Sequence, residues 1–187
     1  MQWSKTKKQL ESFLCNKLQG RIHVHAAVYR KFHDSPGRVW ITFDKEEIVS
    51  AADVTYMINH GKVYQELKQG RKLEPIPTDT DLLGMMKSTE REDLWKASDD
   101  SDDELNRQGL FSTYQLYQSF LGYTSLSIEE ALTSENPVIQ AFAMFDRRLG
   151  KRKLKTLNIT KNMHPLIDEF YQIRCMVEGL EIRSGNH

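Results

Sequence analysis

Hydrophobic and polar residues along the first 50 positions change from a helical period to a period of two. Apolar residues recur at spacings of three and four over 10–18, and Ser4 precedes them where its side chain can accept hydrogen bonds from a first helical turn. Gly20 supplies a left-handed stop. Polar and apolar residues then alternate, as in a strand with one buried face. The pattern predicts a helix and then a strand with these inward residues: Ile22, Val24, Ala26 and Val28.

A second alternation follows a cluster of turn-forming residues. The segment 34–37, Asp-Ser-Pro-Gly, favours a turn, and the alternation resumes over 39–43. A tight turn at Asp44 and Lys45 is expected to lead into a third short strand over 45–51. These spacings predict three antiparallel strands connected as a meander.

The rest of the chain has the period of helices. A helix capped by Asp53 is expected to end at Gly70, and a connector with two prolines follows it. Residues 1–72 are therefore expected to form a helix, a meander and a helix, and residues 79–180 a mainly helical part that stands alone or shares one core with the first. The predicted fold class is α+β, with an N-terminal helix on a small antiparallel β-meander and a mainly helical C-terminal half.

Capping residues define helices in the second half of the chain. Asn136 stands at an N-cap position with Pro137 after it, and the apolar stripe that follows predicts a helix to Leu149 that ends at Gly150. The acidic run over 99–104 has few apolar residues, so it is expected to be a loop or a frayed helix end.

Composition and charge exclude some classes of function. Apolar residues make up 39% of the 187 residues, which is enough for a folded core, and 26 Lys and Arg balance 26 Asp and Glu. No overall field therefore attracts nucleic acid or an anionic membrane. The sequence shows no membrane-spanning or leader segment, and Cys15 and Cys175 lack the spacing of a metal or redox motif. We expect buried thiols and a cytoplasmic location.

One short stretch concentrates positive charge in this neutral chain. The sequence FDRRLGKRKLKTL contains six cations, which are candidate binding residues: Arg147, Arg148, Lys151, Arg152, Lys153 and Lys155. They are expected to project from the solvated faces of two successive helices at a corner. A solvated face is the simplest interpretation, and pairing with the acidic run over 99–104 is another. Contact with an acidic protein partner or with nucleic-acid phosphates is the functional interpretation, of which the acidic partner is preferred.

Other candidate chemistry is weaker. His23 and His25 are predicted to share one strand face, but the sequence nominates no further ligand for a metal. Asp146 lies beside two arginines, and a second carboxylate for a two-metal nuclease site is missing. No glycine-rich phosphate loop, nucleophile elbow or Cys/His pairing is present. We therefore predict no catalytic residue, no metal ligand and no cofactor.

Three segments together carry a resemblance to known proteins. They are YRKFHDSPGRVWITFDKEEI, NPVIQAFAMFDRRLGKRKL and HPLIDEFYQIRCMVEGL, and the resemblance extends over most of the chain. The chain resembles a small family of uncharacterised bacterial proteins with no assigned activity. The resemblance implies a bacterial cytosolic protein and transfers no catalytic residue, ligand or cofactor.

These observations favour a non-catalytic binding or adaptor protein that acts through protein–protein contact. A nucleic-acid-associated protein that uses the stretch from Arg147 to Lys155 is the alternative, and an enzyme of unrecognised type is third.

Overall fold

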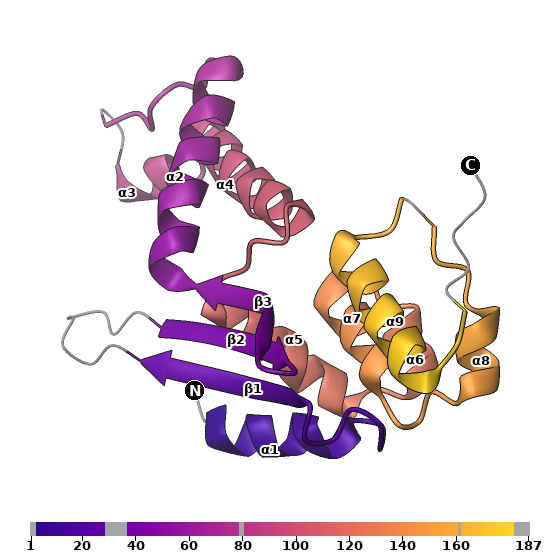
Figure 1. The fold of residues 1–187 in the computed structure, drawn as a ribbon. Coiled ribbons are helices and arrows are strands. Elements are labelled where there is room, and N and C mark those ends of the chain that lie inside the picture. Colours follow the sequence, from indigo (N-terminus) through magenta and orange to yellow (C-terminus); the bar gives the residue numbers. More distant parts are fainter. Residues whose placement is uncertain (1–2, 29–36, 79–80, 161, 182–187) are drawn as a thin grey trace. The chain divides into compact units, whose positions relative to one another are not determined.

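The computed structural model describes residues 3–28, 37–78, 81–160 and 162–181 (Figure 1). The chain divides into two compact units: unit 1 comprises Met1–Ala52 and Phe111–His187, and unit 2 comprises Asp53–Leu110. The proline-containing connector at which the sequence suggests a boundary lies inside unit 2. Ala51 and Phe111, which flank unit 2 in the sequence, form an isolated parallel bridge within unit 1.

Unit 1 begins with a helix and a three-stranded sheet. The helix is α1 (Trp3–Phe13), and the strands are β1 (Ile22–Val28), β2 (Gly37–Phe43) and β3 (Glu46–Ala52), which pair antiparallel in the order β1-β2-β3. Asp44 and Lys45 both have positive φ, at 49° and 76°, as a tight two-residue hairpin requires. The meander is thus confirmed, and the turn predicted at 34–36 lies outside the described residues.

The two faces of the sheet differ as the alternation predicts at Ile22 and Val24, whereas the inward position predicted for Ala26 is wrong, since Ala26 is exposed. Val24 of β1 and Ile41 of β2 are each 1% exposed, whereas His23 and His25 lie on the opposite, partly exposed face. Helix α1 runs beside β1, and α5 (Thr113–Ser125) packs against β2 and β3 (Figure 1). The backbone N–H of Val24 donates to Glu11 of α1 at 3.4 Å, so the helix also covers part of the edge of β1.

The remaining described helices of unit 1 are α6 (Ile128–Leu132), α7 (Pro137–Phe145), α8 (Lys151–Thr156) and α9 (Pro165–Glu178). Of these, α6 and α9 pack against α7. Asn136 caps α7 as predicted, since its Oδ1 accepts from the N–H groups of Val138 and Ile139. Phe145 of α7 stacks on Phe170 of α9 with ring centroids 4.2 Å apart. The predicted class, α+β with a mainly helical second half, is confirmed.

The prediction that α7 extends to Leu149 is wrong. The helix ends at Phe145, and Asp146 takes an extended conformation (ψ 137°). The Asp146 carboxylate accepts a hydrogen bond from the N–H of Arg148 at 2.6 Å, and this local bond competes with continuation of the helix. Gly150 is accordingly the N-cap residue of α8 and does not mark the end of α7.

Unit 2 is built on two long helices. They are α2 (Asp53–Gly70) and α4 (Thr89–Arg107), and the short α3 (Leu82–Met86) precedes α4. The acidic run over 99–104 lies inside α4, so the expected loop or frayed end is wrong. Its carboxylates find hydrogen-bond and ion-pair partners on α2 and within α4, which offsets their mutual repulsion.

Candidate functional site

The six cations of residues 147–155, here called the basic corner, begin at a buried carboxylate. Asp146 is 0% exposed, and its Oδ2 accepts from Nε and Nη2 of Arg148 at 2.9 and 2.7 Å. The same carboxylate accepts from the hydroxyl of Tyr123, which is also fully buried. Asp146 is therefore committed to internal partners and cannot reach an external substrate, which removes the basis for a nuclease interpretation.

Arg148 makes its hydrogen bonds within the protein, although its side chain is 31% exposed. Its Nη1 donates to the carbonyl of Leu126 at 2.7 Å, and its guanidinium lies over the ring of Phe13 at 4.6 Å. The hydrogen bonds to Asp146 raise the pKa of Arg148, and burial raises the pKa of Tyr123. Arg148 thus ties the corner to α1 and to the end of α5, rather than extending into solvent.

A second arginine, which the sequence analysis did not single out, binds the backbone at the start of the basic corner. Arg174 of α9 is 3% exposed and donates to the carbonyl oxygens of Met144, Asp146 and Leu149 at 3.0–3.1 Å. These carbonyls lie in the last turn of α7 and in the segment after it, where no intrahelical donor remains. Glu178 balances the charge of Arg174 at 3.2 Å. The corner is therefore a fixed structure rather than a loose loop.

The other five cations of the corner divide into two groups. Lys151 pairs with Glu178 at 2.9 Å, and Lys153 pairs with Glu129 at 2.7 Å, which lowers the pKa of Glu129. The remaining three are exposed and have no ion-pair partner among the described residues: Arg147, Arg152 and Lys155. Of the six predicted residues, three are thus engaged in internal contacts and three are exposed without an ion-pair partner in the described chain.

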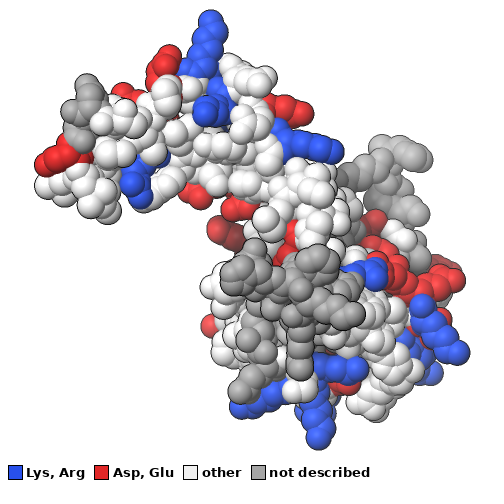
Figure 2. Space-filling model, turned by 90° about the vertical axis from the view of Figure 1, so that its left-hand side faces the viewer, with Lys and Arg blue, Asp and Glu red and all other residues white. Residues whose placement is uncertain are grey.

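The acidic run pairs within unit 2. Asp100 pairs with Arg71 at 2.7 Å, Asp102 accepts from the hydroxyl of Tyr56, and Glu104 pairs with Arg107 at 2.8 Å. These contacts account for three of its carboxylates without the basic corner. Lys and Arg side chains are interspersed with Asp and Glu on the face drawn in Figure 2, so any docking surface has to be local.

The histidine pair on β1 has other partners. His25 stacks on Trp40 with centroids 5.0 Å apart, and its Nε2 lies 3.1 Å from the hydroxyl of Thr42. Nε2 of His23 lies 3.1 Å from the carbonyl of Gly20. Burial, with Lys7 and His23 nearby, lowers the pKa of His25. Within the described parts of the chain, no three His, Cys, Asp or Glu side chains are grouped to hold a metal ion.

Comparison with known proteins places this α+β chain in a family. The chain belongs to the SF0329 protein family, whose model matches residues 2–175. This family is uncharacterised, so membership agrees with the resemblance found in the sequence and assigns no activity. No curated protein and no solved structure matches the chain. Among the described residues, no helix combines the length and the apolar character that crossing a membrane requires.

Proposed function

We propose that the protein is a non-catalytic binding or adaptor protein of the cytoplasm that docks an acidic protein surface on its basic corner. One observation carries the proposal: internal bonds fix the backbone of the corner, while Arg147, Arg152 and Lys155 stay exposed without an ion-pair partner in the described chain. A fixed scaffold lowers the entropy that a partner must overcome on binding. The free thiols Cys15 and Cys175, both buried, agree with a reducing compartment.

An acidic protein explains the corner better than nucleic acid does. Three unpaired cations within nine residues of chain suit a small cluster of carboxylates, whereas non-specific attachment to a duplex usually draws on a larger basic surface. The formal charge of the whole chain is zero, so no long-range field assists the approach of nucleic acid. Nucleic-acid binding remains the second outcome that an experiment has to distinguish.

A matched pair of triple variants tests the proposal. The corner variant replaces Arg147, Arg152 and Lys155 with Gln, which leaves the internally bonded cations in place. The control variant replaces three exposed lysines of unit 1 with Gln and changes the net charge equally: Lys5, Lys8 and Lys17. Binding of a fluorescent Glu/Asp-rich peptide, single-stranded RNA and duplex DNA of mixed sequence is measured by anisotropy at several salt concentrations.

We expect the peptide to bind about tenfold more weakly to the corner variant, a change of about 1.4 kcal/mol, and within about twofold of wild type to the control. Equal weakening in both variants would reduce the corner to a solvated face. Tighter binding of RNA or DNA than of the peptide, with a salt dependence that the corner variant reduces, would favour the nucleic-acid alternative.

A further inference from the structure

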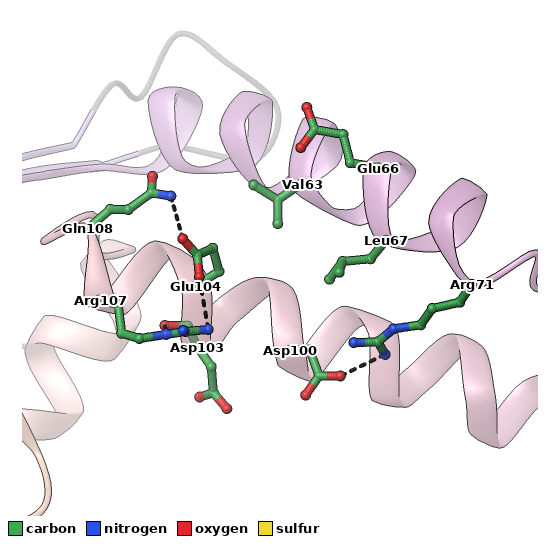
Figure 3. Close-up of a pocket in the computed structure, with 9 residues that line it drawn as sticks. All are labelled: Val63, Glu66, Leu67, Arg71, Asp100, Asp103, Glu104, Arg107 and Gln108. Carbon is green, nitrogen blue, oxygen red and sulfur yellow. Dashed lines mark hydrogen bonds and ion pairs between the residues drawn. The ribbon is translucent and has the colours of Figure 1, made fainter.

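A groove runs between the two long helices of unit 2. It encloses about 440 Å³ and is drawn in Figure 3. Val63 and Leu67 of α2 provide its apolar surface, and both side chains remain partly exposed. Glu66 of α2 and Asp103 of α4 lie at opposite edges of the groove, and their side chains point outward, away from each other (Figure 3). The groove therefore combines an apolar floor with carboxylates on two sides.

The carboxylates of the groove are not equally engaged. Asp100 pairs with Arg71 at 2.7 Å, and Glu104 pairs with Arg107 at 2.8 Å, so these two are neutralised locally. Glu66 and Asp103 are exposed and have no ion-pair partner among the described residues. Two negative charges thus flank the apolar floor without a counter-charge.

The charge of the whole segment has the same sign. Residues 53–110 contain 13 Asp and Glu and 8 Lys and Arg, a formal charge of −5, whereas the rest of the chain contains 18 Lys and Arg and 13 Asp and Glu. The neutral total therefore conceals an acidic unit 2. A field of one sign steers partners of the opposite sign and disfavours like-charged ones.

Unit 2 also leaves much apolar surface uncovered. No described residue of α2 is buried, and α4 buries only Ala97, Ser101 and Leu105 of its described residues. A pair of long helices in a soluble protein normally buries a continuous stripe on each helix. The half-exposed Val63 and Leu67 are the part of α2 that the groove presents to a ligand.

The arrangement suits an organic cation better than a metal ion. In the parts of the chain that the structure describes, no three carboxylates or other ligands are grouped to hold a metal. Lys and Arg carry a long apolar stem that can lie on aliphatic side chains while the charged end stays near water and carboxylates. A groove with an apolar floor and exposed carboxylates at its edges suits this kind of side chain.

We propose that the groove docks a basic amphipathic segment of a protein partner, with its apolar residues on Val63 and Leu67 and its Lys or Arg residues beside Glu66 on one edge and Asp103 on the other. Charge complementarity with an acidic unit selects this occupant, and an amphipathic segment in a helix-lined groove is a common recognition mode. The proposal does not depend on the basic corner. It gives the chain a second docking surface of opposite charge.

The test uses the full-length protein and a labelled 18-residue peptide with Leu and Lys at helical spacing. Two further peptides are compared with it: one with Glu in place of Lys, and one with the same composition in an order that is not amphipathic. The groove variant is Glu66→Gln with Asp103→Asn. Its control is Glu92→Gln with Asp93→Asn, an equal charge change at exposed positions of α4 outside the groove.

We expect the groove variant to weaken binding of the Lys peptide about tenfold and the control to weaken it less than twofold. The Glu peptide should bind at least about tenfold more weakly than the Lys peptide, and the scrambled peptide should bind more weakly as well. Leu67→Gln should weaken binding of the Lys peptide and leave binding of the scrambled peptide unchanged, because only the Lys peptide contacts the apolar floor. The helix content of this variant is verified by circular dichroism.

Two results would overturn the proposal. One is an equal loss of affinity in the groove variant and in the control, which would mean that only the net charge of unit 2 is sensed. The other is binding of spermine with the affinity of the peptide and with the same loss in the groove variant, which would make the groove a polyamine site.

Discussion

Replacing Asp146 with Ala should destabilise unit 1 far more than the loss of one surface charge. The substitution leaves the buried hydroxyl of Tyr123 without its acceptor, and the N–H of Arg148 also loses its partner. A buried donor without a partner costs about 1–3 kcal/mol, and the N–H of Arg148 is only partly buried. The Arg148 side chain keeps its bond to the carbonyl of Leu126, and because it is 31% exposed water can reach the nitrogens that lose Asp146, so it adds little. The expected loss is about 2–4 kcal/mol.

The assay has to report on unit 1 alone. Trp3 and Trp40 lie in unit 1, and Trp95 lies in unit 2, where it is 58% exposed. A Trp95→Phe background therefore makes tryptophan fluorescence a probe of unit 1 in thermal and urea unfolding. For a chain of this size the expected shift of the melting temperature is about 4–16 °C. The control Asp168→Ala, in the first turn of α9, should cost less than about 1 kcal/mol.

A double-mutant cycle with Tyr123→Phe tests the assigned cause. Once the hydroxyl is absent, removal of Asp146 no longer leaves it without an acceptor, so the two losses should be less than additive by about 0.5–3 kcal/mol. A loss below about 1 kcal/mol for Asp146→Ala, or strictly additive losses in the double variant, would refute the view that Asp146 is an acceptor on which the corner depends.

Three further predictions concern other supports of unit 1. Arg174→Met should cost about 3–5 kcal/mol in urea unfolding, because three carbonyls lose their buried donor and Glu178 loses one of its two cationic partners, and a loss under about 1 kcal/mol would contradict this. Asn136→Ala should cost about 1 kcal/mol in thermal unfolding through loss of the α7 cap, with Asn136→Ser much milder. The lowered pKa of His25 means that the unfolded chain binds more protons below about pH 6.5. Stability should therefore fall as pH decreases through 6.5, and His25→Gln should flatten this dependence in urea titrations at pH 7.5 and 5.5.

Local patterns in the sequence predict most of the helices and strands. Alternation and the tight turn at Asp44 and Lys45 predict the meander, and Asn136 predicts the start of α7, because each depends on neighbours in the chain. The end of α7 depends on a competition between helix continuation and the bond from Asp146 to Arg148. The sequence contains both residues, but which conformation wins depends on Tyr123 and Arg174, which come from distant helices.

For the basic corner too, the sequence predicts what depends on neighbouring residues and not what depends on distant ones. The sequence locates all six cations of the basic corner, but it cannot separate those that are paired from those that are free. Lys153 meets Glu129 and Lys151 meets Glu178 across 24 to 27 residues of chain. One feature of the sequence could have indicated Arg174, namely an arginine next to the apolar stripe of α9. An arginine at such a position, however, usually extends its charged end to water. No feature of the sequence predicts the groove of unit 2, because the groove depends on the packing of α2 against α4.

The bridge between Ala51 and Phe111 has a consequence for how this protein can change over time. Because the chain leaves the sheet and returns to it at neighbouring positions, the 58 residues of unit 2 are connected to unit 1 as an insertion is connected to its host domain. Lengthening, shortening or exchanging that insert leaves the strand and helix on either side of it in register. Selection can therefore alter the acidic groove while the host domain and its basic corner stay constant, so that the two surfaces need not acquire or lose their partners together.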